Sequence, residues 1–210
     1  MPTKTLIYIA GPTGVGKTKT SIALAKAFNT EIISCDSRQF YKEMKIGSAI
    51  PTNEELSAVK HHFIQSKSII DRYTVADFEK EAIKTIENIF KEKNIIIMVG
   101  GSGMYADAVM FGMDKFPEIP QETRDQLLVF YETHGLKGLH ELLRKKDPKY
   151  YTQVDINNPA RLLRSLEVSI ASNKPYSSFL GQEREPRSFI SKMIILHCPR
   201  IRLYEKINKR

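Results

Sequence analysis

The chain has 210 residues, of which 41% are hydrophobic and 27% are charged, a composition typical of a globular protein with one core and room for a small appendage. Its 32 basic and 24 acidic side chains give a formal net charge of +8, which favours a polyanionic partner, although many globular proteins are mildly basic. Cys35 and Cys198 are too few for a disulfide framework or a zinc site. We therefore expect a protein of the reducing cytoplasm. The short apolar run LIYIA leads straight into a Gly-rich loop and does not resemble a signal peptide, and no apolar run is long enough to cross a membrane.

Short apolar runs rich in β-branched residues alternate along the chain with segments whose apolar residues recur at helical spacing. This alternation predicts an α/β fold with a doubly wound parallel sheet. We expect strands over residues 6–10, 31–35, 94–99 and 191–198, and helices over residues 17–28 and 76–93.

The character of the sequence changes after the Pro-flanked segment KFPEIPQ, where helical patterns continue without a convincing core strand. We therefore predict a helical insertion mounted on the α/β core. The expected core comprises residues 1–114 and 188–210, and the insertion comprises residues 115–187, with helices over 122–134, 138–145 and 159–171.

A phosphate-binding loop, or P-loop, joins the first predicted strand to the first predicted helix. The stretch GPTGVGKT fits the pattern G-x-x-x-x-G-K-[ST] without a mismatch. In such a loop, backbone N–H groups surround phosphate oxygens, the lysine adds a positive charge, and the final hydroxyl ligates Mg²⁺. The residues are Gly11, Pro12, Thr13, Gly14, Val15, Gly16, Lys17 and Thr18, with Thr18 as the metal ligand.

The loop alone does not identify its ligand. Nucleotide hydrolases usually show another apolar strand that ends in Asp, but the strand NIIIMV is followed by Gly-Gly-Ser. The one carboxylate at a predicted strand end is Asp36, which should face the loop because the carboxyl ends of neighbouring strands open into one crevice. Asp36 would act there as a general base or an outer-shell metal partner, unless it only caps a helix or turn.

Further polar groups are expected near the same edge of the sheet. Ser37, Arg38 and Gln39 follow Asp36 directly, and Arg and Gln are side chains that read base edges by paired hydrogen bonds. The turn GGSG over residues 100–103 adds N–H groups and a hydroxyl, although such a turn is weak evidence by itself.

The insertion carries a basic helix face. Arg161 and Arg164 stand three residues apart in NPARLLRSLEV, so they share one side of a helix. A charge run is usually a solvated surface, but two aligned arginines on a basic appendage suit a nucleic-acid clamp better.

Three polar residues are poorer candidates. His61 and His62 are adjacent, so their side chains would point apart and make a poor metal pair, and we expect one of them to be structural. Asp77 fits a helix start better than a catalytic site.

Six motifs resemble those of the bacterial tRNA dimethylallyltransferases, also called tRNA isopentenyltransferases. The segment DSRQFYKEMKIGSA and the downstream GGSGMY carry the resemblance far more specifically than the P-loop does. In chain order the motifs are GPTGVGKT, SCDSRQFYKEMKIGSAIPT, KHHFI, YTVADF, IIIMVGGSGMY and NNPARLLRSLEV.

The resemblance implies transfer of a dimethylallyl group from dimethylallyl diphosphate to N6 of adenosine 37, on the 3′ side of the anticodon in tRNA, with release of diphosphate. The insertion would grip the anticodon stem-loop, and we expect Mg²⁺ as the cofactor and a monomeric enzyme. The resemblance assigns catalysis to Asp36, as the base at the adenine amine, and to Lys17, Thr18 and Thr13. It assigns tRNA contacts to Asp36, Ser37, Arg38, Gln39, Ser102, Arg124, Ala160, Arg161, Leu162, Leu163 and Arg164.

The chain departs from the family pattern at several positions. Ser102 replaces the threonine of the usual GGTGLY and keeps its hydroxyl. Ile50 stands where the usual IGTAKP has lysine, which puts any charge contact of that lysine in doubt, and Gln65 replaces the acid of an HHLID-like stretch. Family members continue well beyond the LYEKINKR helix, so we expect a core that is incomplete at its C-terminal end.

Three other functions compete with this one. An adenylate isopentenyltransferase would prenylate free nucleotides on the same core, but it would not need the basic insertion. A P-loop small-molecule kinase would use Asp36 to activate a hydroxyl, which the DSRQ and GGSGMY motifs disfavour. An RNA-binding protein with a decayed site is disfavoured by the intact loop and Asp36.

Overall fold

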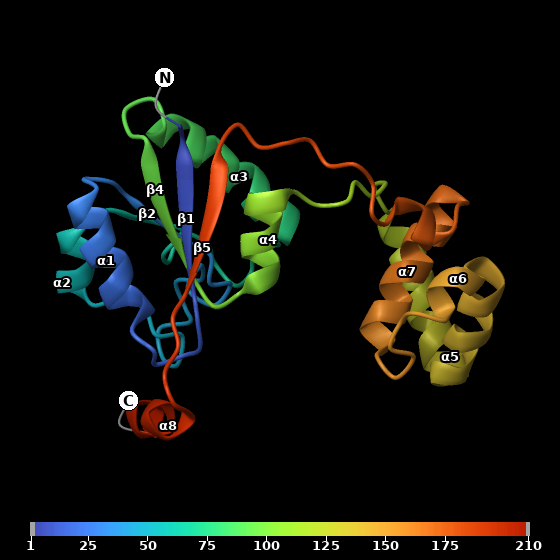
Figure 1. The fold of residues 1–210 in the computed structure, drawn as a ribbon. Coiled ribbons are helices and arrows are strands. Elements are labelled where there is room, and N and C mark those ends of the chain that lie inside the picture. Colours follow the sequence, from blue (N-terminus) through green and yellow to red (C-terminus); the bar gives the residue numbers. More distant parts are fainter. Residues whose placement is uncertain (1–2, 209–210) are drawn as a thin grey trace. The chain divides into compact units, whose positions relative to one another are not determined.

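The computed structural model describes residues 3–208 and divides the chain into two compact units (Figure 1). The α/β unit comprises Met1–Met113 and Glu185–Arg210, and the helical unit comprises Asp114–Arg184. Each unit has its own hydrophobic core.

A five-stranded parallel sheet forms the centre of the α/β unit, with strand order β3-β2-β4-β1-β5. Thr5 at the start of β1 is paired with Ile95 on one side and with Ile190 on the other. The strands are β1 (Thr5–Ala10), β2 (Ile32–Ser34), β3 (His61–His62), β4 (Ile95–Val99) and β5 (Ile190–Ile195). The predicted α/β fold with a parallel sheet is confirmed.

Helices cover both faces of this sheet, as Figure 1 shows. Alternate residues of a strand point to opposite faces, so Leu6 and Tyr8 join one buried cluster while Ile7 and Ile9 join the other. The first cluster includes apolar residues of α3 (Val75–Ile89) and α4 (Gly103–Phe111), and the second includes residues of α1 (Lys17–Ala27). The unit also contains α2 (Asn53–Ala58) and α8 (Arg200–Asn208).

The start of α3 is fixed by a capping box. The Thr74 side chain accepts the Asp77 N–H, and the Asp77 carboxylate accepts the Thr74 N–H at 2.9 Å. Hydrogen bonds from Thr74 lower the pKa of Asp77. Asp77 therefore marks a helix start, as predicted.

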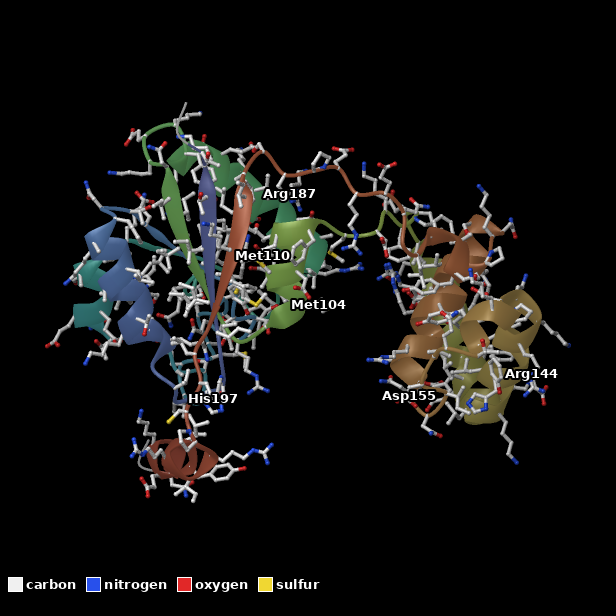
Figure 2. The ribbon with its side chains drawn as sticks, viewed as in Figure 1. Met104, Met110, Arg144, Asp155, Arg187 and His197 are labelled. Atoms are coloured by element: carbon white, nitrogen blue, oxygen red, sulfur yellow. The ribbon has the colours of Figure 1, made fainter. Side chains whose placement is uncertain are left out.

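Arg187 anchors the segment that leads into β5. Its guanidinium donates to the carbonyl oxygens of Val109, at 2.9 Å, and Ala108, at 2.6 Å, at the end of α4. It also pairs with the Glu79 carboxylate on α3. Figure 2 shows Arg187 beside α4, where these contacts hold the segment before it enters the sheet.

The helical unit is built from α5 (Gln121–Lys146), α6 (Pro148–Tyr151), α7 (Pro159–Ser172) and the 3₁₀ helix η1 (Tyr176–Phe179). Gly135 interrupts α5 with a φ of 62°, in the left-handed region that glycine adopts without strain. The two helices predicted on either side of residue 135 are therefore consecutive parts of α5. The core of the unit is made by Leu127, Leu139, Leu143, Leu162 and Leu166.

Asp147 ties the end of α5 to η1, and its loss should unfold this unit more easily. The carboxylate is 1% exposed and accepts hydrogen bonds from the Tyr150 N–H at 2.9 Å, the Ser177 N–H at 2.6 Å and the Ser177 hydroxyl at 2.9 Å. We expect Asp147→Ala to lower the free energy of unfolding of the helical unit by about 3 kcal/mol, because buried N–H groups lose a charged acceptor. Urea unfolding followed by hydrogen exchange of the α5 and α7 amides measures this.

Asp155 provides the control for that experiment. Asp155, which is labelled in Figure 2, is exposed. Its carboxylate accepts a hydrogen bond from the Asn157 N–H at 3.1 Å. Asp155→Ala should lower the free energy of unfolding of the helical unit by about 1 kcal/mol or less, since water replaces the lost partner. Equal costs for the two variants would contradict a structural role specific to Asp147.

Candidate active site

The P-loop lies between the end of β1 and the start of α1. Gly11 and Gly16 have φ values of 148° and 105°, which a side chain would strain. A Cβ on Gly11 would stand 2.7 Å from the Leu196 carbonyl oxygen, so the loop passes tightly beside the end of β5. The Lys17 ammonium donates to the carbonyl oxygens of Gly11, at 2.8 Å, and Pro12, at 3.0 Å, and is thereby held across the loop.

Asp36 follows β2, which is not the direct neighbour of β1, because β4 lies between the two strands. The expectation that Asp36 follows a strand next to β1 is therefore wrong. The turn after β2 packs closely against the turn after β4, and Gly100 allows this contact because it has no side chain. A Cβ on Gly100 would stand 2.5 Å from the Cys35 carbonyl carbon and 2.8 Å from the Asp36 N. Asp36 Oδ1 accepts the Arg38 N–H at 3.1 Å, which fixes the turn that carries the carboxylate.

Ser102 connects the β4 turn to the turn after β2. Its hydroxyl accepts the Ser37 N–H at 3.0 Å and donates to the Ser37 hydroxyl, also at 3.0 Å. A threonine at this position would offer the same hydroxyl, so the departure from the family pattern preserves the interaction. The two turns thus form one connected polar surface next to Asp36.

Gln39 uses its amide inside the protein. The amide nitrogen donates to the carbonyl oxygens of Ser48, at 3.1 Å, and Ala49, at 2.9 Å, and the amide oxygen accepts the Ser34 hydroxyl at 3.1 Å. An RNA contact through this side chain would require these bonds to be exchanged. Arg38, in contrast, is exposed and can reach a ligand directly.

Residues of the P-loop line one open cavity of about 410 Å³ together with Asp36 and Gln39. Lys206, on α8, adds a second ammonium group, which the sequence does not predict because its position in LYEKINKR carries no phosphate-binding signature. A Cβ on Gly14 would lie 3.3 Å from Ile207, which shows that α8 borders the loop. The lining residues are Thr13, Gly14, Gly16, Lys17, Thr18, Asp36, Gln39, Ala49 and Lys206.

A magnesium ion fits the oxygen groups of this cavity. Mg²⁺ keeps several water ligands and usually takes only one or two protein oxygens together with substrate phosphates. The Thr18 hydroxyl and the Asp36 carboxylate are such oxygens, and both line the cavity. Within residues 3–208, no three His, Cys, Asp or Glu side chains gather into a metal-binding group, as a site built entirely from protein ligands would require.

The helical unit distributes its predicted RNA contacts unevenly. Ala160 and Arg161 are exposed, whereas the Leu162 side chain is fully buried and cannot contact RNA. Leu163 is partly buried against the same core. Arg164 is partly occupied, since it pairs with the Glu167 carboxylate at 3.4 Å and lies 5.5 Å from the Phe116 ring centroid.

Arg124, on α5, was also assigned to RNA. Its Nε is buried and has no hydrogen-bond partner within residues 3–208. A guanidinium N–H that is left unpaired inside a protein is costly, and an RNA contact through this nitrogen would require it to become exposed.

No helix in the described part of the chain is both long and apolar enough to cross a membrane.

Comparisons with known proteins identify close relatives. A model of the family described as IPP transferase matches residues 39–210. The tRNA dimethylallyltransferase of Flavobacterium psychrophilum is 50% identical over 211 residues, which cover 98% of this chain and 69% of that protein.

Two solved structures have the same fold. The full-length tRNA isopentenylpyrophosphate transferase of Bacillus halodurans is 37% identical with a TM-score of 0.60, and the match covers 98% of this chain and 64% of that one. A eukaryotic dimethylallyltransferase acting on tRNA is 26% identical with a TM-score of 0.80, over 98% of this chain and 53% of that one. The chain thus spans about two thirds of the bacterial relatives it matches, and it belongs to the IPP transferase family of tRNA dimethylallyltransferases, which confirms the family and the enzyme class predicted from its motifs.

Proposed function

We propose that the protein transfers a dimethylallyl group from dimethylallyl diphosphate to N6 of adenosine 37 in the anticodon stem-loop of tRNA. The observation that carries the proposal is the shared cavity, in which the P-loop and the Asp36 carboxylate line one space. The P-loop can bind a diphosphate leaving group, and the Asp36 carboxylate can take the proton that an attacking amine must lose. The proposal includes a cytoplasmic location, where tRNA is found, and action as a monomer.

The P-loop would stabilise the leaving group. As the allylic C–O bond breaks, negative charge grows on the bridging oxygen of the diphosphate. Lys17 and the loop N–H groups are placed to stabilise this charge, and phosphate oxygens bind an ammonium more strongly than the carbonyl oxygens of Gly11 and Pro12 do. Mg²⁺, held by Thr18 and the diphosphate with Asp36 nearby, would supply further charge neutralisation when bound. Thr13 and Lys206 line the same space and complete the binding site.

Asp36 would act at the adenine amine. The N6 lone pair is delocalised into the purine, so the amine is a weak nucleophile until its proton is removed. As the new C–N bond forms, the Asp36 carboxylate accepts this proton, and diphosphate leaves with the electron pair of the C–O bond. The adenine must leave its stack to reach the cavity, which is less costly in a loop than in a duplex. Ser37, Arg38 and Ser102 border the carboxylate and would contact the RNA there.

The decisive test offers alternative acceptors to the enzyme. Labelled dimethylallyl diphosphate is incubated with unmodified tRNA in one reaction and with AMP or ATP in another. Label in tRNA alone is the expected result. Label in the nucleotide alone would support an adenylate isopentenyltransferase instead. In a separate reaction with ATP and a small alcohol, transfer of the γ-phosphoryl group to the alcohol with release of ADP would support a kinase.

Arg161 should contribute more to tRNA affinity than Arg164. Arg161 is exposed, whereas Arg164 is held by Glu167 and Phe116. We expect Arg161→Ala to weaken tRNA binding and to reduce the slope of log K against log salt by about 0.7–0.9, the effect of losing one phosphate contact. Binding titrations at several salt concentrations measure both.

Lys145 is the matched control, since it is an exposed basic residue on the same unit. Lys145→Ala should leave the salt slope unchanged if the contact is specific to the α7 face. Unchanged affinity and slope in an Arg161→Ala/Arg164→Ala double variant would show that α7 does not contact the RNA backbone.

A further inference from the structure

His61 carries a buried hydrogen-bond acceptor for which the described chain offers no partner. Its Nδ1 lies 2.8 Å from the Val59 carbonyl oxygen, and a carbonyl can only accept, so the proton of the neutral ring is on Nδ1. Nε2 is then an acceptor, and it is buried without a hydrogen-bond partner within residues 3–208. Burial lowers the pKa of His61, which favours this neutral form.

The neighbouring histidine has a different role. His62 Nε2 forms a 2.5 Å hydrogen bond with the Glu31 carboxylate at the sheet edge, so this ring nitrogen has a partner. The unpartnered ring atom is thus particular to His61, although the two residues form the same two-residue strand, β3.

His61 also lines a small cavity of about 40 Å³ that adjoins the phosphate site. A water molecule requires roughly 10–15 Å³ of such space, so the cavity has room for ordered water. It shares four residues with the larger cavity, namely Lys17, Thr18, Asp36 and Gln39.

The Ser21 and Ser34 hydroxyl groups that line this cavity are already used as donors. The Ser21 hydroxyl donates to the Thr18 carbonyl oxygen at 2.8 Å, and the Ser34 hydroxyl donates to the Gln39 amide oxygen at 3.1 Å. A water molecule is the donor that fits the remaining space. It has two hydrogens, and the lining residues include His61, whose Nε2 is an unpartnered acceptor, and Asp36, whose carboxylate is another acceptor.

We infer that His61 is a positioning residue for Asp36 and acts through a water molecule in this cavity, which donates one hydrogen to His61 Nε2 and the other to the carboxylate. The inference rests on the proposed function, because it deepens the role of Asp36 as the base. The imidazole gains and loses no proton in the reaction. It restricts the carboxylate to an orientation in which its remaining lone pair meets the amine.

Two substitutions separate this role from a structural one. In His61→Gln, the amide oxygen can take the place of Nε2 as acceptor, while the donor to Val59 is lost. In His61→Asn, the amide nitrogen can take the place of Nδ1 as donor to Val59, while the acceptor in the cavity is lost. We expect His61→Asn to lower kcat by about tenfold with KM unchanged for both substrates, and His61→Gln to retain kcat within about twofold. A role limited to holding Val59 predicts the reverse order.

His62→Gln is the control, and it should leave kcat unchanged because His62 does not line either cavity of the site. A high-resolution crystal structure provides a readout independent of activity: a water within hydrogen-bonding distance of both His61 Nε2 and Asp36 supports the inference, and its absence overturns it. If wild-type enzyme does not modify tRNA, the proposed function fails. If wild-type enzyme does so while His61→Asn retains full kcat, only the role of His61 is overturned.

Discussion

Replacing Asp36 with asparagine should lower turnover on tRNA by about 10²–10⁴-fold, the contribution typical of a positioned general base. The amide keeps the size of the carboxylate and can still accept the Arg38 N–H, so the turn after β2 should remain intact. It cannot accept the amine proton as the C–N bond forms. The loss should therefore appear in single-turnover kinetics, while tRNA binding, measured by titration, changes by less than about threefold.

Asp71→Asn is the control for this change. Asp71 belongs to the same unit and accepts the Ser68 N–H at 2.9 Å in a turn that does not line the cavity. Near-normal turnover of Asp36→Asn would remove Asp36 as the base. A loss of tRNA affinity equal to the loss of turnover would instead make Asp36 a binding residue only.

Replacing Lys17 with alanine should lower kcat by about 10²–10³-fold, since one preorganised group that stabilises developing charge is typically worth this much. The same change should raise KM for dimethylallyl diphosphate, because the ammonium also attracts the ground-state diphosphate. KM for tRNA should stay the same. Steady-state kinetics with each substrate varied in turn give the three values.

Lys19→Ala is the matched control, because Lys19 is an exposed lysine two positions further along α1 and does not line the cavity. It should reproduce any general effect of removing one positive charge from this basic protein. Lys206→Ala should lower kcat less than Lys17→Ala and more than Lys19→Ala, since Lys206 lines the cavity but lies outside the P-loop. Equal effects of Lys17→Ala and Lys19→Ala would contradict a local role in leaving-group stabilisation.

The local features of the fold could be predicted because they depend on residues close together in the chain. The runs LIYIA and IIIMV are continuous apolar segments, which parallel strands buried on both faces require, and both formed strands. The P-loop is an eight-residue pattern, and the helix after it begins at Lys17 as expected. The short elements α2 and β3 were missed, because six and two residues give no measurable periodicity.

The arrangement of the site depended on pairing over long distances in the sequence. No local pattern states that β4 lies between β1 and β2, or that Gly100 must lack a side chain for the two turns to meet. A local pattern also does not predict that the Gln39 amide donates to the carbonyl oxygens of Ser48 and Ala49.

The sequence by itself determined that this protein has a phosphate loop, a strand-end carboxylate and a basic helical insertion, because each feature depends on a local pattern of residues. Only the tertiary structure decided which groups share the cavity. Lys206 and His61 are brought to the two adjoining cavities by the packing of α8 and the pairing of β3 with β2. Such packing is selected by burial of apolar surface over the whole unit, so residues without a recognisable motif reach the site through the fold.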